Sequence, residues 1–218
     1  MKPTFSKSID PIFLHALELL ERIGSNESPD AGEERARIRA RLDAAEQRIG
    51  QTEEWQLAKY AIVAWVDEML IDAPWDGADW WREQPLEFEI FRSAVAFSGF
   101  YEKAEQASQL TRKDALEVFY ICVVLGFRGM YKDPTTAEGA LRSMDYDLPA
   151  TMEGWAKRYG VSIQVAQDVP LIDERVFPGE GAPWRDGKFL SIGSWSIAAM
   201  LAAALAAVMI WRMKAGLP

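Results

Sequence analysis

Two residue types that often carry chemistry are almost missing from this sequence. Its 218 residues include one cysteine, Cys122, and one histidine, His15. A single cysteine excludes an internal disulfide and is typical of a reducing compartment. One imidazole and one thiol leave carboxylates as the main metal ligands, so we expect no metal site and no cofactor. No nucleophile motif accompanies His15, which we expect to be a solvated or core-edge histidine with no catalytic role.

Positive charge is also scarce. The chain has 24 Lys and Arg against 33 Asp and Glu, a formal net charge of −9. Nucleic acid and anionic lipid surfaces would repel such a protein, so we expect the soluble part of the chain to bind neither. A basic or polar protein surface is the expected complement.

Charge is absent altogether from residues 189–211, near the end of the sequence. A helix of 23 residues would be ~35 Å long, enough to cross a bilayer hydrocarbon core of ~30 Å. Trp195 and Trp211 lie at its two ends, where indole rings favour the membrane interface. We therefore predict a membrane span over residues 191–212, followed by a short periplasmic tail over 213–218. The small residues of the span are compatible with a homodimer and equally with packing against a larger partner.

The rest of the chain is expected to form one all-α domain. Hydrophobic residues recur at helical spacing from residue 1 to 163, and residues 164–190 form a Pro- and Gly-rich linker to the span. The N-terminus lacks an apolar run typical of a secretory signal. We therefore expect a cytoplasmic domain held at the membrane by its C-terminal tail.

Periodicity and capping signals place seven helices in this domain. The stretch from Asp72 to Trp81 is expected to be a loop, because Pro74 and Gly77 interrupt it. The helices are expected from Asp10-Pro11 to Gly24, between Gly32 and Gly50, from Trp55 to Ile71, from Pro85 onward, over 115–127 after a capping box at Thr111–Asp114, from Asp133 to about Asp145, and within 149–159.

Two adjacent acids, Asp67 and Glu68, lie in the helix expected from Trp55 to Ile71, whose other residues leave it without a polar side. A buried carboxylate without partners costs several kcal/mol, so each must be paired or must line a cleft. One interpretation is a buried structural arrangement with an arginine or with helix N–H groups. Another is a negatively charged recognition cleft, and a third is catalytic acid–base chemistry. The two side chains point ~100° apart on a helix, so they cannot act together as a glycosidase pair, and we expect no enzyme.

The segment that follows is rich in acids and tryptophan. Residues 67–89 contain eight acidic residues and one basic residue, Arg82. Such a composition is typical of a protein-contact surface, although tryptophans can also close over a core, as we expect for Trp75. The candidate partner-binding residues are Asp67, Glu68, Asp72, Trp75, Asp76, Asp79 and Trp80.

A second charged feature is expected where two central helices end. Glu117 is the one acid in the apolar stretch 115–127, and Arg128 follows this stretch directly. We predict that Arg128 forms an ion pair with a buried acid, which could be Asp67, Glu68 or Glu117.

Three motifs together resemble a known family. They are Ala58-Lys-Tyr-Ala with Val66-Asp-Glu68, then Pro74-Trp75 with Gly77 and Trp80, and then Leu116-Glu117 with Leu125-Gly-Phe-Arg-Gly-Met-Tyr131. In order and spacing they are similar to the DotU/TssL (IcmH) family of bacterial secretion proteins. The sequence departs from the family pattern at Arg128, where an acid is usual, and at Met130, where a basic residue is usual.

The resemblance implies two small helical bundles arranged as a hook, at the cytoplasmic face of the bacterial inner membrane. Members of the family are non-enzymatic subunits of type VI secretion membrane complexes or of the related type IVB system. They pair with a large IcmF/TssM-like inner-membrane protein and face the cytoplasmic baseplate. A tail-anchored adaptor outside secretion is the remaining alternative.

Overall fold

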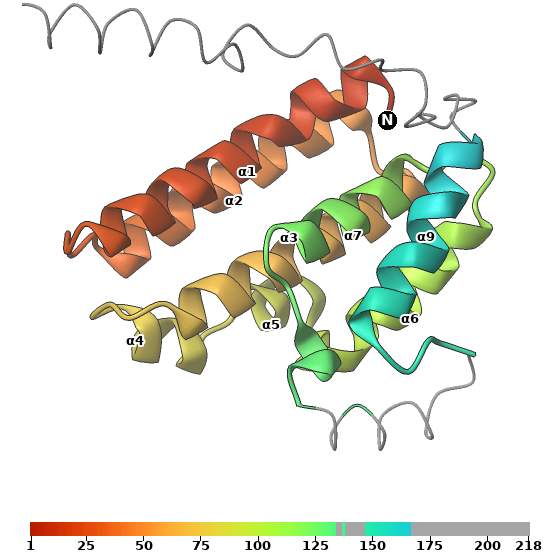
Figure 1. The fold of residues 1–218 in the computed structure, drawn as a ribbon. Helices are drawn as coiled ribbons and strands as arrows, with labels where there is room; N and C mark the ends of the chain where they lie inside the picture. The colour runs from red at the N-terminus through yellow and green to blue at the C-terminus, as the bar shows by residue number, and fades with distance from the viewer. Residues whose placement is uncertain (134–136, 138–146, 167–218) are drawn as a thin grey trace, which may run out of the picture. The chain divides into compact units, whose positions relative to one another are not determined.

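The computed structural model describes residues 1–133, 137 and 147–166. The chain divides into two compact units, Met1–Pro170 and Leu171–Pro218, and all described residues belong to the first. Every regular element among the described residues is helical (Figure 1). The elements are α1 Pro3–Gly24, α2 Ala31–Ile49, α3 Glu53–Asp72, α4 Ala78–Glu83, α5 Leu86–Phe91, α6 Ala96–Gln109, α7 Asp114–Val124, the 3-10 helix η1 Gly129–Lys132, and α9 Met152–Ala166.

The helices α1 and α2 form a long pair that lies side by side in Figure 1. Buried residues such as Leu19, Ile38 and Leu42 join the two helices, while their outer faces carry charge. Asp30 caps α2 by accepting a hydrogen bond of 2.8 Å from the Glu33 N–H.

The first helix begins one residue after Lys2, well before the predicted start at Asp10-Pro11. Pro11 lies inside α1, where it removes one backbone hydrogen bond. Phe5 and Ile9 continue the apolar stripe and are buried. Burial of two large side chains contributes about 3 to 6 kcal/mol, which offsets the cost of about 3 kcal/mol for an internal proline.

The central element is α3, as its all-round apolar sequence predicts. It contacts α1, α2, α4, α5, α6 and α7, and most of the side chains along it are buried. Thr52 caps its start by accepting from the Trp55 N–H at 3.2 Å. The aromatic residues Phe100, Phe119 and Phe127 close the core on the α6–α7 side.

Two predictions beyond α3 were wrong. The expected loop 72–81 contains the start of α4, because Gly77 precedes the helix and does not interrupt it. The helix opened by Pro85 ends at Phe91, and a separate helix, α6, begins at Ala96. Arg92 stands between them in the left-handed region at φ 54°, so one continuous helix is excluded.

The start of α7 also differs from the prediction. Its N-cap is Lys113, with no side-chain cap, so Thr111 does not open a capping box. Asp114 instead accepts a hydrogen bond from the Lys2 N–H at 2.9 Å and ties the beginning of α1 to α7.

The last described helix, α9, extends to Ala166 and so enters the predicted linker 164–190. None of the described helices is long and apolar enough to cross a membrane. Most of the helix expected over 133–145 lies outside the described residues. The same is true of the span 191–212 with Trp195 and Trp211, and of the tail 213–218.

Candidate functional site: the acidic end of α3

The C-terminal half of α3, with α4 and α5, forms the acidic end of the domain, defined by residues 67–89. Its innermost carboxylate is Asp67, which is 4 % exposed. Asp67 accepts hydrogen bonds from the Trp81 indole N–H at 2.8 Å, the Leu86 N–H at 2.9 Å and the Glu87 N–H at 2.8 Å. Pro85 precedes α5 and offers no capping side chain, so Asp67 satisfies the first free N–H groups of that helix from outside. Asp67 therefore fixes α4 and α5 against α3.

Glu68 makes an equivalent contact on another side of α3. Its two oxygens accept from the Arg128 N–H at 2.8 Å and the Gly129 N–H at 2.9 Å. Gly129 has φ +50°, and a Cβ there would come within 2.7 Å of the Phe97 carbonyl oxygen. The turn can therefore approach α6 and Glu68 only because residue 129 is glycine.

A third carboxylate, Glu87, was counted among the surface acids but is 3 % exposed. It accepts from the Tyr60 hydroxyl at 2.8 Å and from the N–H groups of Val95 at 3.2 Å and Ala96 at 3.1 Å. Glu87 thus caps α6, whose N-cap, Val95, has no polar side chain. Two sequence signals could have identified it: a tyrosine inside an apolar helix needs a partner, and a helix that begins at Val95-Ala96 lacks a cap of its own.

Burial changes the protonation of these groups. Removal from water raises the pKa of Asp67 to about 6, although three N–H donors act in the opposite direction. Burial also raises the pKa of Glu68, and the donors from Arg128 and Gly129 oppose this increase. The pKa of the Tyr60 hydroxyl is raised by burial and by its bond to Glu87.

The remaining acids of this end lie on the surface. Asp72, Asp76 and Asp79 are exposed. Asp72 pairs with Lys132, Asp79 pairs with Arg82, and Asp76 accepts from the Ser28 hydroxyl at 2.8 Å.

The two candidate tryptophans are half-buried. The Trp75 indole N–H donates to the Leu70 carbonyl at 2.8 Å, and its ring packs on the core, as expected. The Arg35 guanidinium lies 5.5 Å from the Trp80 ring centre and 5.6 Å from that of Trp81. Trp80 therefore keeps part of its surface exposed, while Arg35 holds the ring in place.

A surface pocket brings two of the candidate residues together. It has a volume of about 370 Å³ and lies where the α1–α2 turn meets the start of α4. Asp76 and Trp80 line it from one side and Asp30 from the other. The structure thus separates the predicted site into buried acids that bind backbone N–H groups and exposed acids beside an aromatic pocket.

The predicted partners of Arg128 differ in kind from those observed. Arg128 does meet Glu68, but through its backbone N–H. Its guanidinium donates to the carbonyls of Val123 at 3.1 Å and Phe127 at 3.0 Å, where it caps the end of α7. Glu117 forms an ion pair with the Met1 ammonium group.

The described residues form no constellation for metal binding. They contain no group of three or more His, Cys, Asp or Glu side chains that could hold a metal ion. His15 is buried and lies 2.9 Å from Glu34, which Arg22 and Arg37 also contact. Burial and the nearby Arg41 lower the pKa of His15. Cys122 is fully buried, and burial raises the pKa of its thiol.

Comparison with known proteins identifies the family. The family model described as "Type VI secretion system protein DotU" matches residues 5–213. The chain belongs to the DotU family. DotU proteins are components of type VI secretion systems, as the description of the model states. The resemblance carried by the three sequence motifs is thereby confirmed.

A solved structure has the same helical fold. The cytoplasmic domain of TssL from Acinetobacter baumannii matches this DotU chain with a TM-score of 0.58 and 24 % sequence identity. The match covers 76 % of this chain and 99 % of the TssL domain. No curated protein matched the sequence.

Proposed function

We propose that this DotU protein is a non-enzymatic structural subunit of the type VI secretion membrane complex. Residues 191–212 anchor it in the bacterial inner membrane, and its helical domain faces the cytoplasm and links the membrane complex to the baseplate. The observation that carries this proposal is the family match over residues 5–213, which includes both the helical domain and the uncharged stretch near the C-terminus. The description of the matched model favours the type VI over the type IVB system.

The acidic end is the surface that we assign to a cytoplasmic partner. Asp72, Asp76 and Asp79 are exposed, and the adjoining pocket contains the half-buried ring of Trp80. An aromatic ring beside several carboxylates is suited to a basic segment with an apolar or arginine side chain at its centre. Asp67 is buried, so it acts on such a partner only by positioning α5.

The anchor is the part that we assign to membrane partners. A large IcmF/TssM-like protein is the expected neighbour in the bilayer, and the small residues of the span also allow a homodimer. No nucleic acid is expected as a partner, given the net charge of −9.

The test is co-purification of the full-length protein from detergent-solubilised native membranes, followed by identification of its cross-linked neighbours. We expect a large inner-membrane protein and a soluble baseplate protein. Deletion of residues 191–218 should release the domain into the soluble fraction, and recovery of the anchored protein alone would contradict the proposal.

A matched pair of variants tests the acidic end. Asp72→Asn, Asp76→Asn and Asp79→Asn combined should weaken capture of the soluble partner at least tenfold and leave the membrane partner bound. The control combines Glu18→Gln, Glu21→Gln and Asp43→Asn, which changes the net charge equally at exposed positions outside the acidic end. Equal loss in both variants would show that net charge, and not this surface, is recognised.

A further inference from the structure

The outward face of α1 carries large apolar residues that the domain does not bury. Leu14 is 58 % exposed and Leu17 is 38 % exposed, and Pro11 is exposed as well. These side chains follow one another at intervals of three residues, so they form one ridge along the helix. Ile12 and Ala16 point ~160° away from Leu14 and are buried, so the ridge faces outward.

The ridge ends in a charge of opposite sign on each side. Lys7 and Glu21 are each seven residues from Leu14, and both are exposed. Seven residues make nearly two helical turns, so Lys7, Leu14 and Glu21 point in the same direction to within ~20°. We call this line, from Lys7 through Pro11, Leu14 and Leu17 to Glu21, the α1 ridge.

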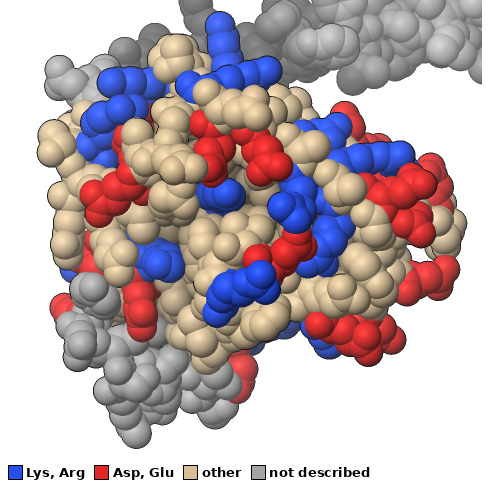
Figure 2. All heavy atoms as spheres, turned by 180° about the vertical axis from the view of Figure 1, so that it is seen from behind, with Lys and Arg blue, Asp and Glu red and all other residues tan. Residues whose placement is uncertain are grey.

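Many charged side chains elsewhere on the domain have partners within the chain. Figure 2 shows Lys and Arg side chains next to Asp and Glu side chains over much of the face seen from behind. Arg37, for example, pairs with both Glu33 and Glu34. Among the residues that the structure describes, Lys7 and Glu21 have no ion-pair partner. Both charges are therefore available to a second molecule.

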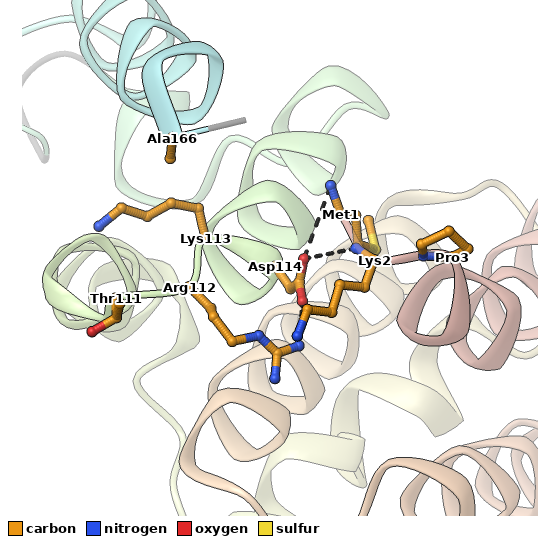
Figure 3. Close-up of a pocket in the computed structure, with 8 residues that line it drawn as sticks. All are labelled: Met1, Lys2, Pro3, Thr111, Arg112, Lys113, Asp114 and Ala166. Carbon is orange, nitrogen blue, oxygen red and sulfur yellow. Dashed lines mark hydrogen bonds and ion pairs between the residues drawn. The ribbon is translucent and has the colours of Figure 1, made fainter. Parts of the chain in front are cut away.

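Contacts at both ends of α1 hold the ridge in place. The dashed lines in Figure 3 join Asp114 of α7 to the Lys2 N–H, at 2.9 Å, and to the Met1 ammonium group, at 3.9 Å. Near the other end of α1, Arg22 pairs with Glu34 of α2 at 3.0 Å. Because the helix is already fixed to α7 and α2, a contact along its outward face requires little further ordering of the chain.

The charge pattern of the ridge is complementary to itself in one arrangement. When two copies of α1 lie antiparallel with Leu14 opposite Leu14, Lys7 of each copy faces Glu21 of the other. Pro11 of each copy then faces Leu17 of the other, so the apolar residues meet at the centre. A parallel arrangement would instead place like charges together. Helices that cross at ~20° remain in contact over several turns, which brings the charged ends within reach.

Two further acids border the ridge without entering its centre. Asp10 and Glu18 are exposed and lie on opposite edges of the ridge, ~80° apart around the helix. In the antiparallel arrangement, Asp10 of one copy and Glu18 of the other reach the same level along the helices but on opposite rims. Water and salt screen their repulsion at this separation, so it does not prevent the pairing.

We propose that two copies of this chain pair through the α1 ridge, as antiparallel helices related by a two-fold axis. The inference deepens the proposed function and rests on it, because it gives the homodimer considered there a contact in the helical domain. Interfaces of standard size use about 20 to 30 residues a side, many more than the ridge offers. The contact is therefore weak, and it forms where copies are concentrated, as in a membrane complex.

Disulfide cross-linking of the full-length protein in its native membranes tests the geometry. Leu14→Cys faces itself across the two-fold axis, so a mild oxidant should link two copies. Leu17→Cys faces residue 11 and should link to itself at least fivefold less. Co-expressed Pro11→Cys and Leu17→Cys copies with different tags should link to each other. Cys122 is buried and should not react, which the unsubstituted protein verifies.

Charge reversal tests the pairing of the ridge ends. In the Leu14→Cys protein, Lys7→Glu alone or Glu21→Lys alone should reduce cross-linking at least fivefold, because each makes two pairs repulsive. The two reversals together exchange the charges and should restore cross-linking. The control combines Lys157→Glu with Glu83→Lys, which are equal changes at exposed positions on α9 and α4, and it should leave cross-linking unchanged.

The outcomes separate this inference from the proposed function. Loss of the protein from the membrane fraction would contradict the anchor. Membrane-bound protein that links equally through positions 14 and 17, or not at all, would overturn the antiparallel contact alone. Failure of the double reversal to restore cross-linking would overturn it as well. A disulfide between Leu14→Cys and a different protein would overturn it by showing that another partner covers the ridge.

Discussion

The acidic end contains two sets of carboxylates that are alike in sequence and different in role. Asp67, Glu68 and Glu87 bind backbone N–H groups of α5, α6 and the turn before η1. Asp72 and Asp76 are a few residues away and bind only surface side chains. Asp67, Glu68 and Glu87 serve as caps that the local sequence does not supply. The carboxylates of Asp72 and Asp76 are exposed to solvent. Acidic composition at this end is therefore evidence for a partner only where the carboxylates are exposed.

Among the carboxylates that bind backbone N–H groups, Asp67 is expected to give the largest loss of stability when it is replaced. Asp67→Ala removes the acceptor for the N–H groups of Trp81, Leu86 and Glu87, and these donors are buried. Each unsatisfied buried donor costs about 1 to 3 kcal/mol, so we expect a loss of about 4 kcal/mol. Chemical denaturation followed by tryptophan fluorescence measures it. A loss below 1 kcal/mol would show that water replaces the carboxylate and that Asp67 does not hold α5.

The pH dependence of stability is the next largest effect. The pKa of Asp67 is raised to about 6 in the fold, whereas an unfolded aspartate titrates near 3.8. The native state therefore binds this proton more tightly, and stability decreases as pH rises from about 4 to about 6. One pKa unit corresponds to about 1.4 kcal/mol, so the contribution of Asp67 is about 3 kcal/mol.

Other carboxylates also have shifted pKa values, so the comparison must be made between variants. Burial raises the pKa of Glu54, and hydrogen bonds from Lys59 and Trp55 lower that of Glu46 to about 2. Subtracting the profile of Asp67→Asn from that of the unsubstituted protein isolates the single group. A flat difference between pH 4 and 7 would show that the three donors cancel the effect of burial.

Sequence reasoning succeeded where a pattern is local and failed where a partner is distant. The apolar character of α3 and the two acids within it could be predicted, because helical periodicity places both acids among apolar side chains. Whether these acids are buried or line a cleft stayed open, and the structure buries Asp67 and leaves Glu68 half-buried. The hydrogen-bond donors to these acids could not be predicted, because the free N–H groups of α5 and of Arg128 come near α3 only after the chain has folded back.

The same limit explains the errors at helix boundaries. Asp10-Pro11 has the composition of a helix start, yet the burial of Phe5 extends α1 through it. Arg92, at positive φ, separates α5 from α6, and Glu87 of α5 accepts a hydrogen bond from the Ala96 N–H at the beginning of α6. In each case a tertiary contact outweighed a local signal.

Glu68→Gln should lower the free energy of unfolding by less than a substitution of Asp67 does. Glu68 is half-buried, so water can reach the turn at Arg128 and Gly129 when one oxygen becomes an amide nitrogen. We expect a loss of about 1 kcal/mol, measured by the same denaturation experiment. Hydrogen exchange should show faster opening confined to residues 127–131. A loss as large as that of Asp67→Ala would mean that both carboxylates are equally essential and that depth of burial does not distinguish them.

The smallest effect on stability is expected when the exposed acids of the acidic end are replaced. Asp72, Asp76 and Asp79 contact one surface side chain each, and exposed contacts of this kind contribute 0 to about 1 kcal/mol. Their joint replacement by asparagine also relieves repulsion among like charges at the acidic end, which offsets part of that loss. We therefore expect a net change within about 0.5 kcal/mol, by the same denaturation measurement, in the variant that loses its soluble partner. Loss of the partner together with a large loss of stability would instead mean that these acids act through the fold, and the distinction between the two sets would no longer hold.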